Sequence, residues 1–200
     1  MVFRVDAQEG HTLRIEKAVA YHTSRGLPVR ELSDRCRRTL DRAARYDLDH
    51  WLAEQRDWYD EFWAASDVEV ASDDRNHGAI QQAIRFNLFT LAQASGRADG
   101  HGVAAKGVTG SGYEGHYFWD SEVYVAPFLT YTQPDLARNL MHFRSRMLPA
   151  ARDRARELSQ RGALFPWRTI NGEEASAYYA AGTAQVHIDA DDAHALVQYL

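Results

Sequence analysis

The feature that most constrains the fold is helical spacing of apolar residues, which runs from about residue 29 nearly to the end of the chain. One such stripe comprises Val29, Leu32, Cys36, Leu40 and Ala43. Intervals of three and four residues place these side chains on one face of a helix. Before residue 29 apolar and polar residues alternate, which is the spacing of strands. We therefore expect a mainly helical chain that two short strands precede.

The expected strands cover about residues 2–6 and 12–18, with a turn at Glu9-Gly10. Two strands alone are marginally stable in water, so further strands must partner them. At the other end, the last helix reaches Leu200 without the glycine or asparagine that commonly caps a helix. We expect both ends to be cut from a larger protein.

Three prolines predict details of the helical part. Pro127 should kink a helix that begins near Trp119, and Pro149 should interrupt the next helix. Pro134 suits the first position of that helix, since the missing N–H is not needed there. The helix that follows Asn76 is apolar around most of its circumference, which predicts burial on most sides.

Charge and cysteine content exclude several classes of function. The net charge is −5 with both signs scattered, and no basic tract suggests binding to nucleic acid or to an anionic membrane. No apolar run is long enough to cross a bilayer. Cys36 is the only cysteine, which excludes an internal disulfide, disfavours a zinc cluster and fits a cytoplasmic protein.

A glycine-rich loop is the strongest functional signal. Seven of the 13 glycines lie between Gly96 and Gly115, and the loop ends in Tyr-Phe-Trp-Asp at residues 117–120. Glycine lets the backbone approach a ligand closely, and flat aromatic faces beside a carboxylate suit a sugar ring. The alternative is a surface loop followed by the start of a core helix.

A second loop, residues 162–183, has the same character. Trp167 and Arg168 combine a stacking face with a fork of donors, and Glu173 and Glu174 follow. Loops of this kind between long helices describe an α-barrel whose mouth binds a ligand. The alternative for Arg168 and either glutamate is an ordinary ion pair.

Histidine and aspartate at residues 187, 189 and 191 raise the question of a metal. Only His187 and Asp191 share a helical face, and two ligands do not make a site. We expect no metal ion, and we expect His187 to form hydrogen bonds near the barrel mouth or core. A nucleophile elbow, a phosphate-binding loop and a dinucleotide fingerprint are absent from the sequence.

Three sequence blocks resemble glycoside hydrolase family 65, the family of maltose, trehalose and kojibiose phosphorylases. They are residues 97–102 with 106–122, residues 165–176 (Phe-Pro-Trp-Arg-Thr-Ile-Asn-Gly-Glu-Glu-Ala-Ser), and residues 181–191. The opening Leu-Arg-Ile-Glu-Lys at 13–17 and Tyr-His-Thr-Ser at 21–24 also look like this family. The resemblance covers almost the whole chain.

The resemblance implies an architecture. Residues 1–27 correspond to the last strands of an amino-terminal β-sandwich, residues 28–72 to a helical linker, and residues 73–200 to the first half of an (α/α)6 catalytic barrel. An incomplete barrel leaves apolar helices uncovered, so we expect self-association, with a homodimer in the parent protein.

The resemblance also implies an inverting reaction. Phosphate, as co-substrate and without a further cofactor, attacks an α-linked glucose disaccharide and yields β-glucose 1-phosphate and glucose. The family's acid, a glutamate in a Pro-Asp-Glu-Tyr segment, is absent from these residues and is expected beyond Leu200. The substrate-binding residues implied are Trp119, Asp120, Trp167, Arg168, Glu174, His187 and Asp189.

Alternatives remain open from the sequence. The parent protein could instead be a trehalase of the same family, in which water replaces phosphate. The isolated chain, which we expect to be inactive, could be a noncatalytic sugar-binding or structural fragment. An unrelated α-barrel lyase or epimerase would not share the three blocks.

Overall fold

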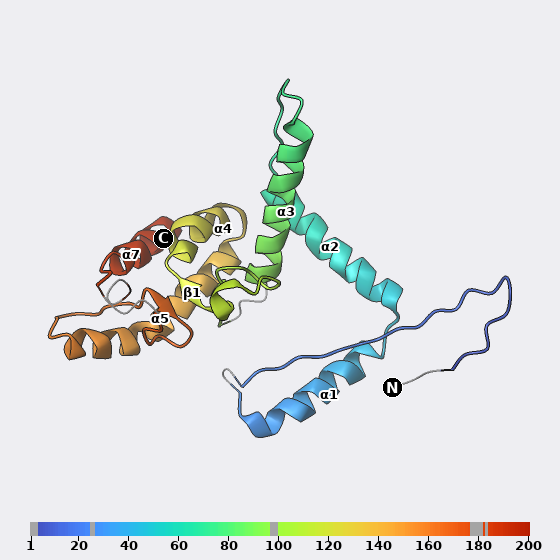
Figure 1. Cartoon of the computed structure of the whole chain (residues 1–200), viewed down its shortest axis with the longest axis horizontal. Helices are drawn as coiled ribbons and strands as arrows, with labels where there is room; N and C mark the ends of the chain where they lie inside the picture. Colours follow the sequence, from blue (N-terminus) through green and yellow to red (C-terminus); the bar gives the residue numbers. More distant parts are fainter. Residues whose placement is uncertain (1–3, 25–26, 97–99, 177–181, 183) are drawn as a thin grey trace. The chain divides into compact units, whose positions relative to one another are not determined.

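The computed structural model describes residues 4–24, 27–96, 100–176, 182 and 184–200. Within it the chain forms two compact units, Met1–Asp60 and Glu61–Leu200, and Figure 1 labels the α-helices and β1. The predicted mainly helical fold class is confirmed, because helices make up 58% of the structure. The two strands of the described sheet lie at residues 117–118 and 168–169, away from the predicted strand segments. None of the described helices is long and apolar enough to cross a membrane.

In the first unit, a short 3-10 turn, η1 (Val29–Glu31), leads into α1 (Leu32–Ala43), and α2 (Leu48–Ser66) begins. The preceding segment lies along α1. His22 Nε2 is 3.1 Å from Thr39 Oγ1, and the Cys36 thiol donates to the Ala20 carbonyl at 3.7 Å. The segment predicted as a helical linker, residues 28–72, contains α1 and α2.

The structure differs from the sequence prediction at the amino end. Residues 4–24 lie outside helices and strands, although the predicted turn is present, with Gly10 at φ 81°. Residues 2 and 3 lie outside the described residues, and the described apolar residues of the expected strands are exposed, among them Val5, Leu13 and Ile15. A strand needs a paired neighbour for its backbone hydrogen bonds, and the described chain supplies none here.

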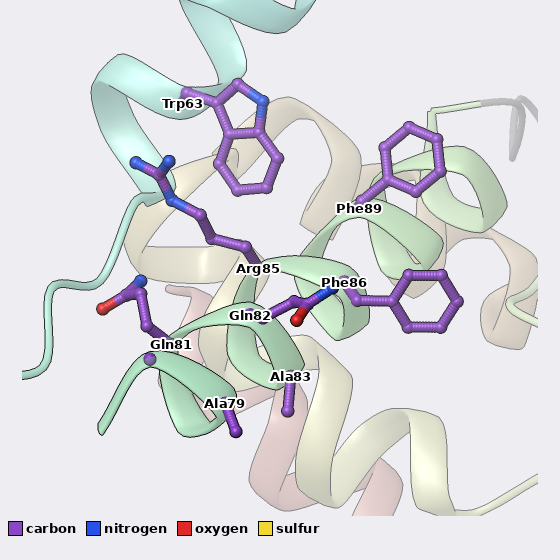
Figure 2. Close-up of a pocket in the computed structure, with 9 residues that line it drawn as sticks. Trp63, Ala79, Gln81, Gln82, Ala83, Arg85, Phe86 and Phe89 are labelled. Atoms are coloured by element: carbon purple, nitrogen blue, oxygen red, sulfur yellow. The ribbon is translucent and has the colours of Figure 1, made fainter. Parts of the chain in front are cut away.

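The second unit contains α3 (His77–Ser95), and here the prediction of burial on most sides is wrong. Only Ala92, Ala94 and Ser95, near its end, are buried, whereas Phe86 is 63% exposed. Apolar helix faces are buried only where other elements cover them. Figure 2 shows the resulting open groove of about 790 Å³, which Trp63 of α2 and residues of α3 line.

Near Pro127, where the sequence predicted a kink, the helix changes type. A π-helical segment, η3 (Ser121–Val125), precedes α4 (Ala126–Thr132), and Pro127 lies in the first turn of α4. Proline is tolerated in a first turn because its missing N–H has no partner to lose there.

Pro134 begins α5 (Pro134–Glu157), as predicted, but α5 continues through Pro149 without a break. The prediction of an interruption is wrong. Pro149 deprives the carbonyl of Ser145 of its donor, and Ser145 is exposed, so water can replace that bond. Burial of Met147 and Ala151 on either side of Pro149 holds the helix in the core.

The core of the second unit lies where α4, α5 and α7 (Ile188–Tyr199) meet. Its buried apolar residues are Tyr117, Ala126, Leu140, Phe143, Met147 and Ala195. Two short strands, β1 (Tyr117–Phe118) and β2 (Arg168–Thr169), form the sheet. A 3-10 turn, η2 (Gly112–Gly115), precedes β1.

Candidate functional site

The two-stranded sheet joins the two loops that the sequence singled out. β1 and β2 are antiparallel, with Tyr117 opposite Thr169 and Phe118 opposite Arg168. The Tyr117 ring packs 4.7 Å from the ring of Phe143 in the core, and Thr169 is fully buried. Because successive side chains of a strand point to opposite faces, Phe118 and Arg168 lie on the other face of the sheet.

Phe118 is the centre of an aromatic cluster on that face. Trp167 meets the Phe118 ring edge-on at 5.3 Å, and Tyr113 meets it at 5.2 Å. The Arg168 guanidinium lies 5.9 Å from the centroid of the same ring. The half-buried Trp167 and the exposed Tyr113 therefore have their ring positions fixed by contacts with Phe118.

Arg168 links the second loop to the glycine-rich loop. Its Nη2 donates to Glu114 Oε2 at 3.1 Å, while its buried Nε has no hydrogen-bond partner among the described residues. The same Nη2 is 3.2 Å from Nδ1 of His116, which is 2.8 Å from the Tyr113 carbonyl oxygen. A carbonyl only accepts and a guanidinium only donates, so Nδ1 can form one of these two hydrogen bonds at a time, according to whether it carries the ring proton.

Two successive residues of η2 adopt left-handed backbone conformations although neither is glycine. Tyr113 has φ 58° and Glu114 has φ 55°. Each costs about 1–2 kcal/mol for an L-residue, so the surrounding contacts must hold them. Those contacts are the Glu114–Arg168 ion pair and the hydrogen bond from the His116 backbone N–H to the Tyr113 carbonyl.

Glu174 organises the second loop from within. Its carboxylate accepts hydrogen bonds from the backbone N–H groups of Trp167 (2.8 Å), Arg168 (3.2 Å) and Ser176 (3.0 Å). Arg154 of α5 pairs with it at 3.2 Å. These contacts favour a structural role for Glu174, which places Trp167 and Arg168.

The third sequence block reaches the same region through α7. The His187 ring meets Trp119 edge-on at 4.8 Å, and its Nδ1 is 2.6 Å from Asp191 Oδ2. Asp189 accepts the backbone N–H of Phe165 at 2.9 Å. Thus His187 contacts a predicted sugar-binding residue, whereas Asp189 anchors the second loop.

Asp120 lies on a different side of the cluster. It is exposed and lines a cavity of about 330 Å³ with side chains of α3 and the glycine-rich loop, including Asn87, Thr90 and Lys106. The described lining residues include none of the 162–176 segment. The structure therefore groups Trp167, Arg168 and Glu174 beside Phe118, pairs Trp119 with His187, and leaves Asp120 at a neighbouring cavity.

A buried ionic cluster beneath the site was missed by the sequence analysis. Glu122 is fully buried and accepts from Arg144 twice, at 2.7 Å from Nε and at 2.8 Å from Nη2. Asp192 Oδ1 is 3.5 Å from the same Nε. Burial alone would lower the pKa of Arg144, but the charge and hydrogen bonds of Glu122, followed by the charge of Asp192, raise it overall.

One signal in the sequence could have revealed this cluster. Arg144 occupies a position four residues after Leu140 and three before Met147, on the apolar stripe of α5. A charge at such a position is buried and must be paired. Among the described residues, no group of three or more histidine, cysteine, aspartate or glutamate side chains could hold a metal ion.

The groove along α3 is not the predicted site. The groove along α3 in Figure 2 is mostly apolar and shares no lining residue with the cluster around Phe118. The Phe118 cluster instead combines aromatic faces with a guanidinium and an imidazole. That combination can stack against a flat polar ring and hydrogen-bond its hydroxyl groups.

Two family models match the chain. The glycosyl hydrolase family 65 central catalytic domain matches residues 85–200, and the N-terminal domain of the same family matches residues 1–62. The first match covers the glycine-rich loop, the second loop and α7. Neither match tests the predicted boundaries near residues 27 and 72.

Relatives in the curated proteins carry phosphorylase names. The chain is 42% identical over its whole length to an α,α-trehalose phosphorylase of Thermoanaerobacter brockii, and it covers 25% of that protein. It is 52% identical over 147 residues to an α,α-trehalose phosphorylase of Geobacillus stearothermophilus, which is 73% of this chain and 19% of the relative. The chain thus spans about a quarter of such relatives.

A solved structure from the human microbiome, provisionally named a kojibiose phosphorylase, has a similar fold. It superposes with a TM-score of 0.76 at 31% identity. The match covers 86% of this chain and 22% of the other.

Proposed function

The chain belongs to glycosyl hydrolase family 65, and on that premise we propose that it forms part of an inverting phosphorylase of an α-linked glucose disaccharide. In this proposal inorganic phosphate attacks the anomeric carbon, giving β-glucose 1-phosphate and glucose. One observation carries the proposal. Residues of the second and third blocks pack on two successive residues of the first: Trp167 and Arg168 contact Phe118, and His187 contacts Trp119.

We assign these residues to the nonreducing glucose. Trp119 and Trp167 offer apolar faces to the ring, and the Arg168 guanidinium beside Phe118 offers donors to a hydroxyl. Asp120, exposed at its cavity beside Lys106, accepts from hydroxyls remote from the anomeric carbon. Glu174 and Asp189 position the second loop rather than contact the sugar, since their carboxylates accept from its backbone.

We favour α,α-trehalose among the α-linked disaccharides. The identity is 42% and 52% with relatives named trehalose phosphorylases, against 31% with the provisionally named kojibiose phosphorylase. Maltose and kojibiose are the alternatives that the experiment below distinguishes.

The proposal needs an acid that the 200 residues do not supply. An inverting reaction requires a carboxylic acid to protonate the leaving oxygen, and the Pro-Asp-Glu-Tyr segment expected for it is absent from the sequence. We therefore propose that catalysis belongs to a longer protein, and that this chain alone binds sugar weakly. A cytoplasmic location, a homodimer and the absence of a cofactor other than phosphate stay predictions.

The test is phosphate dependence in a longer protein that contains these residues. Trehalose, maltose and kojibiose are each incubated with and without phosphate, and the products are followed by proton NMR. We expect trehalose to be cleaved only with phosphate and the β anomer of glucose 1-phosphate to appear first. Equal cleavage without phosphate would identify a trehalase, and the α anomer would contradict inversion.

A second measurement addresses the noncatalytic alternative. The 200-residue chain is titrated with glucose by calorimetry, beside the Asp120→Ala variant. Binding by the chain that the variant weakens supports a partly formed sugar site. If the chain shows no heat with glucose, the proposed half-site is not formed in isolation.

A further inference from the structure

The buried cluster beneath the site contains two carboxyl groups, Glu122 and Asp192, and one guanidinium, Arg144. Glu122 takes two hydrogen bonds from Arg144, whose Nη2 also donates to the Phe118 carbonyl. Asp192 is 12% exposed and approaches Arg144 Nε only to 3.5 Å. Neither of its buried carboxylate oxygens has a hydrogen-bond partner among the described residues. Asp192 is therefore a second carboxylate beside the Arg144 guanidinium, which is already paired with Glu122.

The groups around Asp192 add to this imbalance. Glu122 faces it from η3, Arg144 from α5, and Asp189 and Asp191 from its own helix α7. Within α4 (Ala126–Thr132), which also packs on α7, the one titratable side chain is Tyr131, and it is 81% exposed. Once Glu122 has neutralised Arg144, an ionised Asp192 is an uncompensated buried charge.

We propose that Asp192 is a proton-linked positioning residue, whose neutral form lets α7 dock against η3 and α5 and whose ionisation loosens that docking. α7 carries Asp189, which anchors the second loop, and it begins beside His187, which contacts Trp119. Ionisation of Asp192 would therefore loosen two contacts of the site at once. This inference depends on the cluster and not on the proposed reaction.

The pKa of Asp192 agrees with this proposed role. Burial raises it to about 7, the charge of Arg144 opposes the rise, and the charges of Glu122, Asp189 and Asp191 add to it. The unfolded chain loses this proton at its ordinary value of 3.8. Between these two values the folded state holds a proton that the unfolded state has released, so stability falls as pH rises through this window. Above about 7 both states are ionised and the loss is complete.

The test is urea unfolding of the 200-residue chain at a series of pH values from about 4.5 to 8.5, with Asp192→Asn beside it. Asparagine has the same shape and cannot ionise. As pH rises from about 5 to 7, we expect the unfolding constant of the parent, relative to the variant, to approach a tenfold rise per pH unit. Asp135→Asn, an exposed carboxylate on α5 with 87% exposure, should follow the parent.

The unfolding curves, or an NMR titration in their place, decide whether Asp192 has this role. If the curves of the parent and Asp192→Asn run parallel over this range, the proposal is overturned. If Asp192→Asn does not fold, the pKa of Asp192 is measured instead, by carbon NMR titration of its carboxyl group in the parent chain. A midpoint above about 6 supports the proposal, and one below about 5 overturns it. Hydrogen exchange adds a local readout, because α7 amides should lose protection in the parent above neutral pH.

Discussion

Arg144 Nη2 donates to the main-chain oxygen of Phe118 at 3.0 Å, which fixes β1 to helix α5 immediately before Trp119 and Asp120. Glu122 holds the same guanidinium from the first turn after those residues. The position of the predicted sugar-binding residues thus depends on a buried ion pair. It also follows that changes far from any ligand can disturb the site.

Replacement of Arg144 by methionine should destabilise the chain by about 3–5 kcal/mol, because Glu122 is then a buried charge without its partner. Adding Glu122→Leu should recover part of the loss, since the double variant leaves neither charge. Urea unfolding at neutral pH measures both. Arg138→Met, on the exposed side of α5, is the control and should change stability by less than about 0.5 kcal/mol. A double variant as unstable as Arg144→Met would contradict the ion-pair explanation.

Glu174→Gln should loosen the second loop, whereas Glu173→Gln should not. The carboxylate of Glu174 accepts three backbone N–H groups and pairs with Arg154, and glutamine retains one acceptor oxygen without the charge. We expect a loss of about 1–3 kcal/mol. Glu173 is exposed and bonds only locally to Asn171 in the described contacts. Hydrogen exchange of the Trp167 and Arg168 amides is the local measurement, and equal exchange in both variants would exclude this role.

Gly110→Ala should strain the glycine-rich loop. A methyl group at Gly110 would lie 2.6 Å from the Lys106 carbonyl oxygen, which is backbone and cannot swing aside. The expected cost is about 1–3 kcal/mol. Gly78→Ala provides the contrast, since nothing lies within 4 Å of a methyl group there and alanine is the better helix former. Thermal unfolding of both variants checks the prediction, and a neutral Gly110→Ala would show that the loop rearranges freely.

Asp120→Ala in a longer, active protein should lower kcat/KM for trehalose by about a hundredfold, or ~3 kcal/mol, if the carboxylate binds sugar hydroxyls. Asp135→Ala, which is also exposed but lies on α5 outside the cavity, should leave kcat/KM unchanged. Steady-state kinetics at saturating phosphate measure both. Equal kinetics for the two variants would remove Asp120 from the proposed site.

The sequence predicted helices well where local chemistry decides them. Pro134 opened α5 as expected, because proline at a first helical position loses no hydrogen bond. The same local reasoning was wrong at Pro149, where burial of the residues on either side outweighs one missing bond. It was also wrong for α3, whose apolar faces the described chain leaves open. In both cases packing rather than local sequence decided the result.

For the site, the sequence by itself determined which segments are candidates, because residue types such as Trp119, Asp120, Trp167 and Arg168 stand out by their chemistry and their family resemblance. Only the tertiary structure decided how they are grouped. In the structure β1 pairs with β2, and the carboxylates of Glu174 and Asp189 accept hydrogen bonds from the backbone of the second loop. Asp120 lines a separate cavity, and Glu122, Arg144 and Asp192 form a buried ionic cluster. The physical reason is that hydrogen bonds and buried charges depend on distances between atoms far apart in the chain, and sequence spacing does not encode those distances.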